Sequence, residues 1–302
     1  MSLKSTIRRA LPSWAMDGLR QGRKRYRSYR WRMQARTASE PAISEDRLAA
    51  DLRALGLKPG QDVIVHGSLS KLGVVEGGPA TVLRALRAVL GPEGTLLMPV
   101  YPMKTTMYEH MRDPKPFDMR TDRSTMGAVT EIFRQQPGVL RSGHPTHSVA
   151  AEGPAARNYT ERHHLSRSPC GPGSPFRLLS ERGGMILCLG TGIGKVTSQH
   201  TIEDLVEDYP FPVYLPEPMV KTVIFPDGHQ EAVEVLVHDP ALTPKRVDNC
   251  APVTREIHDD MRRAGIVREG SVGRAEAQLF AAADLDDLHR ERLKRGKTIY
   301  AV

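Results

Sequence analysis

His200 and Glu203 are the two residues of this 302-residue sequence whose types and spacing best suit proton transfer. An imidazole takes up a proton near neutral pH, and a nearby carboxylate can raise its basicity or hold a charged substrate. Residues three apart lie on one face of a helix, so the two side chains can meet. An ion pair on a solvated helix face has the same spacing, so the pair alone does not distinguish the two interpretations.

The segments before this pair are of the kind that carries chemistry in α/β proteins. Residues 185–189 are an apolar run typical of a buried strand, and residues 190–194 contain three glycines. A strand, an open loop and a helix start, in this order, are where α/β folds place reactive side chains. The position therefore favours the functional interpretation of His200 and Glu203.

The rest of the body, residues 43–302, predicts a single α/β/α domain with a mixed central sheet. Ser44 is the expected N-cap of a helix that Gly56 ends, and Pro79 is the expected first residue of another helix. We expect residues 101–122 to form a long loop over the site. Hydrophobic periodicity and turn residues also predict strands at 63–65, 95–100 and 149–151, helices at 126–133, 174–182 and 275–293, and a hairpin over 220–237.

The three cysteines are scattered and show no Cys-x-x-Cys spacing. This pattern argues against a disulfide framework or a thiolate zinc site and fits a reducing cytoplasm. No apolar run reaches the roughly 18 residues of a membrane-spanning helix, and the start lacks the apolar region of a secretory signal. We therefore expect a cytoplasmic protein.

Residues 1–42 form a basic, aromatic arm. They contain eleven Lys and Arg against two acidic residues, which leaves 32 basic and 33 acidic residues in the remainder, and they contain both tryptophans. Interleaved arginines and aromatic rings suit the inner face of a membrane, and the same composition would bind nucleic acid or form a tail that contacts a partner. Peripheral membrane contact is kept as an alternative, no nucleic acid is expected, and the oligomeric state stays open.

Several segments, taken together and in order, resemble the aminoglycoside 3-N-acetyltransferase family. These enzymes move an acetyl group from acetyl-CoA to a sugar amine. The resemblance covers residues 44–290, and its two most specific blocks match the patterns "RSxHPxxSvxAxG" and "TxxHxxE". The segments are "VHGSLSKLG", "GGPATVLRAL", "GPEGTLLMP", "MGAVTEIFR", "GVLRSGHPTHSVAAEG", "GSPFRLL" and "TSQHTIE".

The resemblance implies roles for particular residues. The histidine of the last block, His200, would be the general base, and Glu203 would orient it or the amine. The cosubstrate is acetyl-CoA, and no metal is expected. The residues that would bind the cosubstrate are His66, Ser68, Leu69, Gly73, Arg141, Ser142, His144 and Thr197.

The sequence departs from the family pattern near the expected acceptor site. Val100 follows Pro99 where the family usually has a threonine, the segment 121–124 replaces a Thr-Pro-Ser segment, and Gln199 stands where an apolar residue is usual. A polycationic antibiotic is best held by an acidic cleft, which Asp204 and its neighbours Glu207 and Asp208 could line if they are not simply a solvated face. The acceptor is therefore expected to be an aminoglycoside or a related amino sugar. The alternative is an amino sugar of a nucleotide-linked or envelope-polysaccharide precursor.

Two other function classes fit parts of the sequence. A metal-dependent hydrolase could use His144, His147, His200 and Glu203 as ligands, because His-x-x-His and His-x-x-Glu spacings occur at metal sites. Pro145 disfavours a helix that would carry both His144 and His147. A non-catalytic protein that binds through its arm is the second alternative, and the presence of the His200 and Arg141 blocks argues against it.

Overall fold

A computed structural model describes residues 41–302 of the chain. The predictions for the basic arm, including membrane contact, fall almost wholly on residues outside this range. Within residues 41–302, none of the helices has both the length and the apolar character needed to cross a membrane.

A seven-stranded mixed sheet forms the centre of the molecule, in the order β4-β5-β2-β1-β6-β10-β9. Strands β1, β2 and β6 are mutually parallel, while β4, β5, β9 and β10 join by antiparallel pairing. The predicted mixed α/β fold is confirmed. The strands span β1 Asp62–Gly67, β2 Thr95–Pro99, β4 Leu140–Arg141, β5 Val149–Glu152, β6 Met185–Leu189, β9 Arg268–Val272 and β10 Ala275–Ala281.

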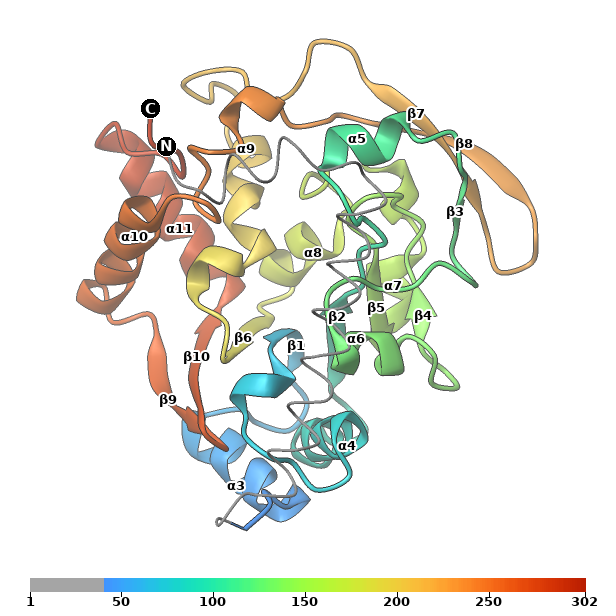
Figure 1. Cartoon of the computed structure of the whole chain (residues 1–302). Coiled ribbons are helices and arrows are strands. Elements are labelled where there is room, and N and C mark those ends of the chain that lie inside the picture. The colour runs from blue at the N-terminus through green and yellow to red at the C-terminus, as the bar shows by residue number, and fades with distance from the viewer. Residues whose placement is uncertain (1–40) are drawn as a thin grey trace, which may run out of the picture.

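Helices cover both faces of this sheet (Figure 1). Successive side chains of a strand point to opposite faces, so Val63 and Val65 pack on one layer and Ile64 packs on the other. The first layer contains α3 Glu45–Leu55, α4 Pro79–Leu90 and α6 Ala128–Phe133, and the second contains α7 Ala156–Thr160, α8 Pro175–Glu181, α10 Ala251–Arg263 and α11 Ala282–Lys294.

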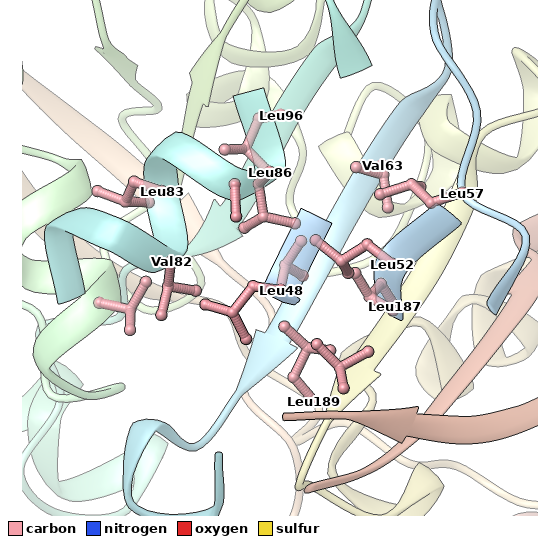
Figure 2. Close-up of a cluster of buried hydrophobic side chains, with 14 of the residues drawn as sticks. Leu48, Leu52, Leu57, Val63, Val82, Leu83, Leu86, Leu96, Leu187 and Leu189 are labelled. Atoms are coloured by element: carbon pink, nitrogen blue, oxygen red, sulfur yellow. The ribbon is translucent and has the colours of Figure 1, made fainter. Parts of the chain in front are cut away.

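The first helical layer begins and ends as its sequence predicts. The side chain of Ser44 accepts a hydrogen bond from the backbone of Arg47, and Gly56 ends α3 with φ 108°, a left-handed conformation that favours glycine. Leu48 and Leu52 of α3 then meet α4 and the sheet in one leucine- and valine-rich core (Figure 2). This packing holds β1 and β6 in place, and the cavity described below lies at the carboxyl ends of these strands.

A smaller sheet, in the order β3-β7-β8, lies beside the main one. Strands β7 Met219–Ile224 and β8 Gln230–Val235 form the predicted hairpin. The segment predicted as a loop, residues 101–122, is partly regular: it contains α5 Met107–Arg112 and β3 Phe117–Asp118, which pairs with β7. Thr106 and Glu109 form a capping box that starts α5, a local signal that a loop assignment overlooks.

The prediction of a single helix over residues 275–293 is wrong for the first part of the segment. Residues Ala275–Ala281 form β10 between β6 and β9, and only the following α11 is helical. Alanine, glutamate and leucine favour helices by weak intrinsic preference, and pairing inside a sheet overrides that preference.

Candidate active site

A cavity of about 360 Å³ opens where β1, β2 and β6 end. These strands are parallel, so their carboxyl ends lie at one edge of the sheet. Ligands of α/β proteins bind at such an edge, in cavities of about this size. The wall includes His66 and Gly67 from the end of β1, Pro99 at the end of β2 and Tyr101 after it, and Thr191, Gly194, Lys195, Val196, Thr197 and His200 after β6.

His200 and Glu203 come together as predicted. The 3₁₀ turn Thr197–Thr201 runs into the short helix α9 Ile202–Leu205, and the Nδ1 of His200 lies 2.7 Å from Oε1 of Glu203. The two side chains are 11% and 0% exposed. The alternative of a solvated surface pair is therefore wrong, and His200 lies at the inner wall of the cavity.

Glu203 has further partners that no local sequence pattern indicates. His238 Nε2 lies 2.7 Å from Oε2, Tyr300 donates to Oε1 at 2.6 Å, and Tyr214 donates to Oε2 at 3.3 Å. Burial alone would raise the pKa of the Glu203 carboxyl, but the charges and hydrogen bonds of His200 and His238 hold its pKa well below its usual range. Glu203 is therefore a buried carboxylate.

A carboxylate can only accept hydrogen bonds, and this assigns the protons of both imidazoles. The Nδ1 of His200 must carry its hydrogen toward Glu203, so in the neutral imidazole Nε2 has the lone pair. By the same argument His238 carries its hydrogen on Nε2. Its Nδ1 is buried and has no hydrogen-bond partner among residues 41–302. His200 is thus held in the tautomer that can accept a proton from a bound molecule.

Helix α11 supports the 3₁₀ turn that carries His200. The amide of Gln199 donates to the carbonyl of Ile193 at 3.2 Å, so its oxygen accepts from Nε2 of His289, 2.5 Å away. Burial lowers the pKa of His289 to about 3, so this imidazole is neutral. Thr201 also donates to Asp286 of α11. The polar Gln199, a departure from the family pattern, has its partner in this helix.

The part of the cavity wall near His200 is aromatic and polar. The hydroxyls of Tyr101 and Thr197 are 2.6 Å apart, and the ring of His147 lies 4.7 Å from that of Tyr101. Thr146 Oγ1 and His147 Nδ1 are 2.9 Å apart. Burial lowers the pKa of His147 well below its usual range. This wall therefore offers hydroxyl donors and a neutral imidazole beside His200.

The predicted cosubstrate loop borders the cavity. His66 and Thr197 line it, and Ser68 and Leu69 line a small adjoining pocket. Burial lowers the pKa of His66 to about 4, and its Nε2 has no hydrogen-bond partner in the described part of the chain. Gly73 follows this loop with φ 93°. Coenzyme A binding by these residues stays a prediction.

Arg141, Ser142 and His144 lie deeper and are not among the residues that line the cavity. Arg141 donates to the carbonyls of Val100, Met119 and Asp122 and to Oγ of Ser148. Ser142 Oγ lies 2.8 Å from Nδ1 of His163, and the ring of His144 stacks on His163 at 4.7 Å. This block holds the wall together, and its predicted contact with the cosubstrate is untested.

The ligand set suggested for a metal hydrolase does not assemble as a group. Within residues 41–302, the residues whose ligand atoms converge are His200, Glu203 and His238. Each of the two histidine nitrogens is 2.7 Å from a carboxylate oxygen. Two ligands of one zinc ion lie about 3.3 Å apart, from bonds of about 2.1 Å in a tetrahedral arrangement. The contacts fit direct hydrogen bonds better than a shared ion.

Two of the three thiols are buried and protonated. Burial raises the pKa of Cys170 well above its usual range and raises the pKa of Cys188 to about 12. None of the three cysteines belongs to the cavity wall. A thiolate nucleophile is therefore not part of this site.

An α/β fold with a histidine–carboxylate pair at its strand ends defines a class of enzymes that act by proton transfer. The family model described as aminoglycoside 3-N-acetyltransferase matches residues 64–294. The chain belongs to the aminoglycoside 3-N-acetyltransferase family. This confirms the resemblance seen in the sequence and the expectation of an acyltransferase.

Curated relatives and solved structures agree with this assignment. Aminoglycoside N(3)-acetyltransferase VII of Streptomyces paromomycinus is 34% identical over 272 residues, 82% of this chain and 91% of the relative. Aminoglycoside N(3)-acetyltransferase III of Serratia marcescens is 33% identical over 254 residues, 80% of this chain and 93% of the relative. The structure of AAC-IIIb in a binary complex with CoASH is 28% identical, with a TM-score of 0.72 over 87% of this chain and 100% of that one. The structure of AAC-VIa bound to sisomicin is 26% identical, with a TM-score of 0.70 over 87% of this chain and 100% of that one.

Proposed function

We propose that this protein transfers the acetyl group of acetyl-CoA directly to an amino group of an aminoglycoside or a related amino sugar, with His200 as the general base. The observation that carries the proposal is the cavity-facing imidazole of His200, whose Nδ1 is held by the buried carboxylate of Glu203. Relatives named as aminoglycoside acetyltransferases, one solved with CoASH and one with sisomicin, support the donor and the acceptor class.

The reaction needs a base because a sugar amine is largely protonated at pH 7. Nε2 of His200 takes a proton from the amine. The nitrogen of the deprotonated amine then attacks the thioester carbonyl. The new C–N bond gives a tetrahedral intermediate. Tyr101 and Thr197 are hydrogen-bonded to each other, which leaves one hydroxyl hydrogen of the pair to stabilise its oxyanion. The C–S bond then breaks, the coenzyme A thiolate takes up the proton from the imidazolium, and the second proton lost from the amine nitrogen passes through Nε2 of His200 to solvent.

Transfer is direct, without an acetylated enzyme. No serine or cysteine is among the cavity-lining residues of the described chain. Glu203 stabilises the imidazolium that forms, and His238 and Tyr300 are positioning residues that hold Glu203. The loop with His66, Ser68, Leu69 and Gly73 would receive the cosubstrate. Arg141, Ser142 and His144 would support cosubstrate binding indirectly, by holding the neighbouring segments of the cavity wall in place.

Thiol release from acetyl-CoA tests this function. The wild type, His200→Ala and the exposed control His229→Ala would be compared with sisomicin and a set of amino sugars. General base catalysis contributes about 10²–10⁴-fold, so kcat/KM should fall by about that factor in His200→Ala alone, with unchanged binding of coenzyme A. An activity of His200→Ala within a few-fold of the wild type would contradict the assigned base.

A further inference from the structure

The wall of the cavity carries more positive than negative charge at neutral pH. Lys195 and Arg246 are its cations, and Asp248 is the one carboxylate among the lining residues of the described chain. His66 and His147 are buried in the wall as neutral imidazoles. An ammonium group entering this cavity therefore meets a single carboxylate.

That carboxylate is already paired. Arg246 donates from Nε to Oδ1 of Asp248 at 2.7 Å and from Nη2 to Oδ2 at 3.1 Å, and both side chains are about three-quarters buried. Lys195 Nζ donates to the backbone carbonyl of Asp248 at 2.5 Å. The two cations thus converge on one residue. The two-pronged contact satisfies both oxygens of Asp248, while other N–H groups remain on the guanidinium and the ammonium.

The acidic residues near the catalytic pair do not add to the wall. Glu203 lies behind His200 and is fully occupied by its donors. Asp204 accepts from Tyr214 at 2.9 Å, and burial raises its pKa. Glu207 and Asp208 are exposed and belong to another part of the surface. The acidic cleft that would suit a polycationic acceptor is not formed by these residues.

We infer that the acceptor is an amino sugar that carries an anionic group, a phosphate or a carboxylate, which Arg246 and Lys195 bind while its amine lies at His200. The inference rests on the proposed acetyl transfer and narrows its substrate class. A polycation would leave several ammonium groups without partners in this cavity, at a cost in desolvation. An anionic group would instead form charge-assisted hydrogen bonds with the two cations.

The first test compares glucosamine compounds that share the 2-amine and differ in charge, with the polycation sisomicin as the contrasting acceptor. Glucosamine, glucosamine 6-phosphate, UDP-glucosamine and sisomicin would be offered with acetyl-CoA to the full-length enzyme. We expect kcat/KM to be about 10- to 100-fold higher for a phosphorylated sugar than for glucosamine, the range of hydrogen bonds to a charged group. The preferred phosphorylated sugar then identifies a free sugar phosphate or a nucleotide-linked sugar as the source of the anionic group.

The second test removes the charge of Arg246 or of Asp248 in turn, because the two substitutions should change kcat/KM in opposite directions. Arg246→Gln leaves Asp248 unpaired, so kcat/KM should fall about tenfold or more for the phosphorylated sugar and rise for sisomicin. Asp248→Asn should do the reverse. Arg157→Gln, an exposed substitution in α7, should change neither value. A merely structural role of Arg246 would lower both activities together.

The outcomes separate the inference from the function on which it rests. A preference for sisomicin over every anionic sugar would overturn the inference and leave acetyl transfer standing. A raised KM for acetyl-CoA in Arg246→Gln, with the acceptor KM unchanged, would assign the cations to the cosubstrate and also overturn it. Acetyl-CoA that stays intact with every amine tested would overturn the proposed function itself.

Discussion

Glu203 lies between two imidazoles and two phenols, and this arrangement fixes where each proton resides. His200 and His238 donate to different oxygens of one carboxylate, and Tyr300 adds a donor to the oxygen that His200 uses. Because the Glu203 carboxylate is buried, removing any one of its hydrogen-bond donors leaves its negative charge less well stabilised. The basicity of His200 therefore depends on residues that need not touch the substrate.

Tyr300→Phe isolates this contribution. The phenol donates to Glu203 at 2.6 Å, and a hydrogen bond to a charged group contributes about 1.5–3 kcal/mol. We expect part of this free energy to stabilise the transition state, in which His200 is charged. The kcat should therefore fall about tenfold, whereas KM for acetyl-CoA should not change. Steady-state kinetics would measure kcat and KM separately, and Tyr108→Phe, outside the cavity, is the matched control. An unchanged kcat would mean that Tyr300 only packs against its neighbours.

At the scale of elements, the turn that carries His200 is supported by α11, nearly a hundred residues later. Gln199 bonds to His289, and Thr201 bonds to Asp286. The 3₁₀ turn is too short to be stable alone, so its geometry comes from these tertiary contacts. A substitution in α11 should therefore affect His200, the proposed general base, without contacting it.

Gln199→Leu tests that support. The substitution leaves a buried N–H of His289 without an acceptor, which costs about 1–3 kcal/mol in the free energy of unfolding. Urea unfolding would measure the loss, and the double mutant Gln199→Leu, His289→Leu should recover part of it. The exposed Gln230→Leu should stay within about 0.5 kcal/mol of the wild type. Strictly additive single-mutant effects would show that the two side chains are not coupled.

The sequence could predict the elements with local signals and part of the site. The strand, loop and turn around His200 follow one another in the chain, and Ser44 and Gly56 mark the ends of α3 within a few residues. His238 and Tyr300 are 35 and 97 residues from Glu203, so no spacing connects them. β10 was missed because its helix-favouring residues are held by pairing with β6, a contact that only the assembled sheet provides.

At the scale of the whole molecule, several buried histidines are kept neutral. Burial lowers the pKa of His66 to about 4 and the pKa values of His144 and His289 to about 3, against an ordinary value of 6.5. The unfolded chain therefore binds protons between pH 6.5 and 4 that the folded chain excludes. Their contribution to stability is complete above pH 6.5 and is lost as the pH falls toward 4.

The free energy of unfolding should accordingly decrease on acidification from pH 7 to 4.5. Each such histidine contributes a slope of up to about 1.4 kcal/mol per pH unit. His144→Asn, which keeps an acceptor for the backbone N–H of His147, should flatten the curve measured by urea unfolding. His229→Asn is the contrasting control, because its carboxylate partners raise the pKa of His229 and its removal should not flatten the curve. A slope that is the same in His144→Asn and the wild type would contradict the assignment.

The contact between Glu203 and Tyr300 also has a consequence for protein synthesis. When Glu203 has been added to the growing chain, a further 97 residues remain to be added up to Tyr300, whose phenol completes its hydrogen bonds. At about 5–20 residues per second, ribosomes need roughly 5–20 s to add them. A nascent chain that already contains His200 and Glu203 therefore lacks the support of α11 and the Tyr300 donor until these later residues have been made.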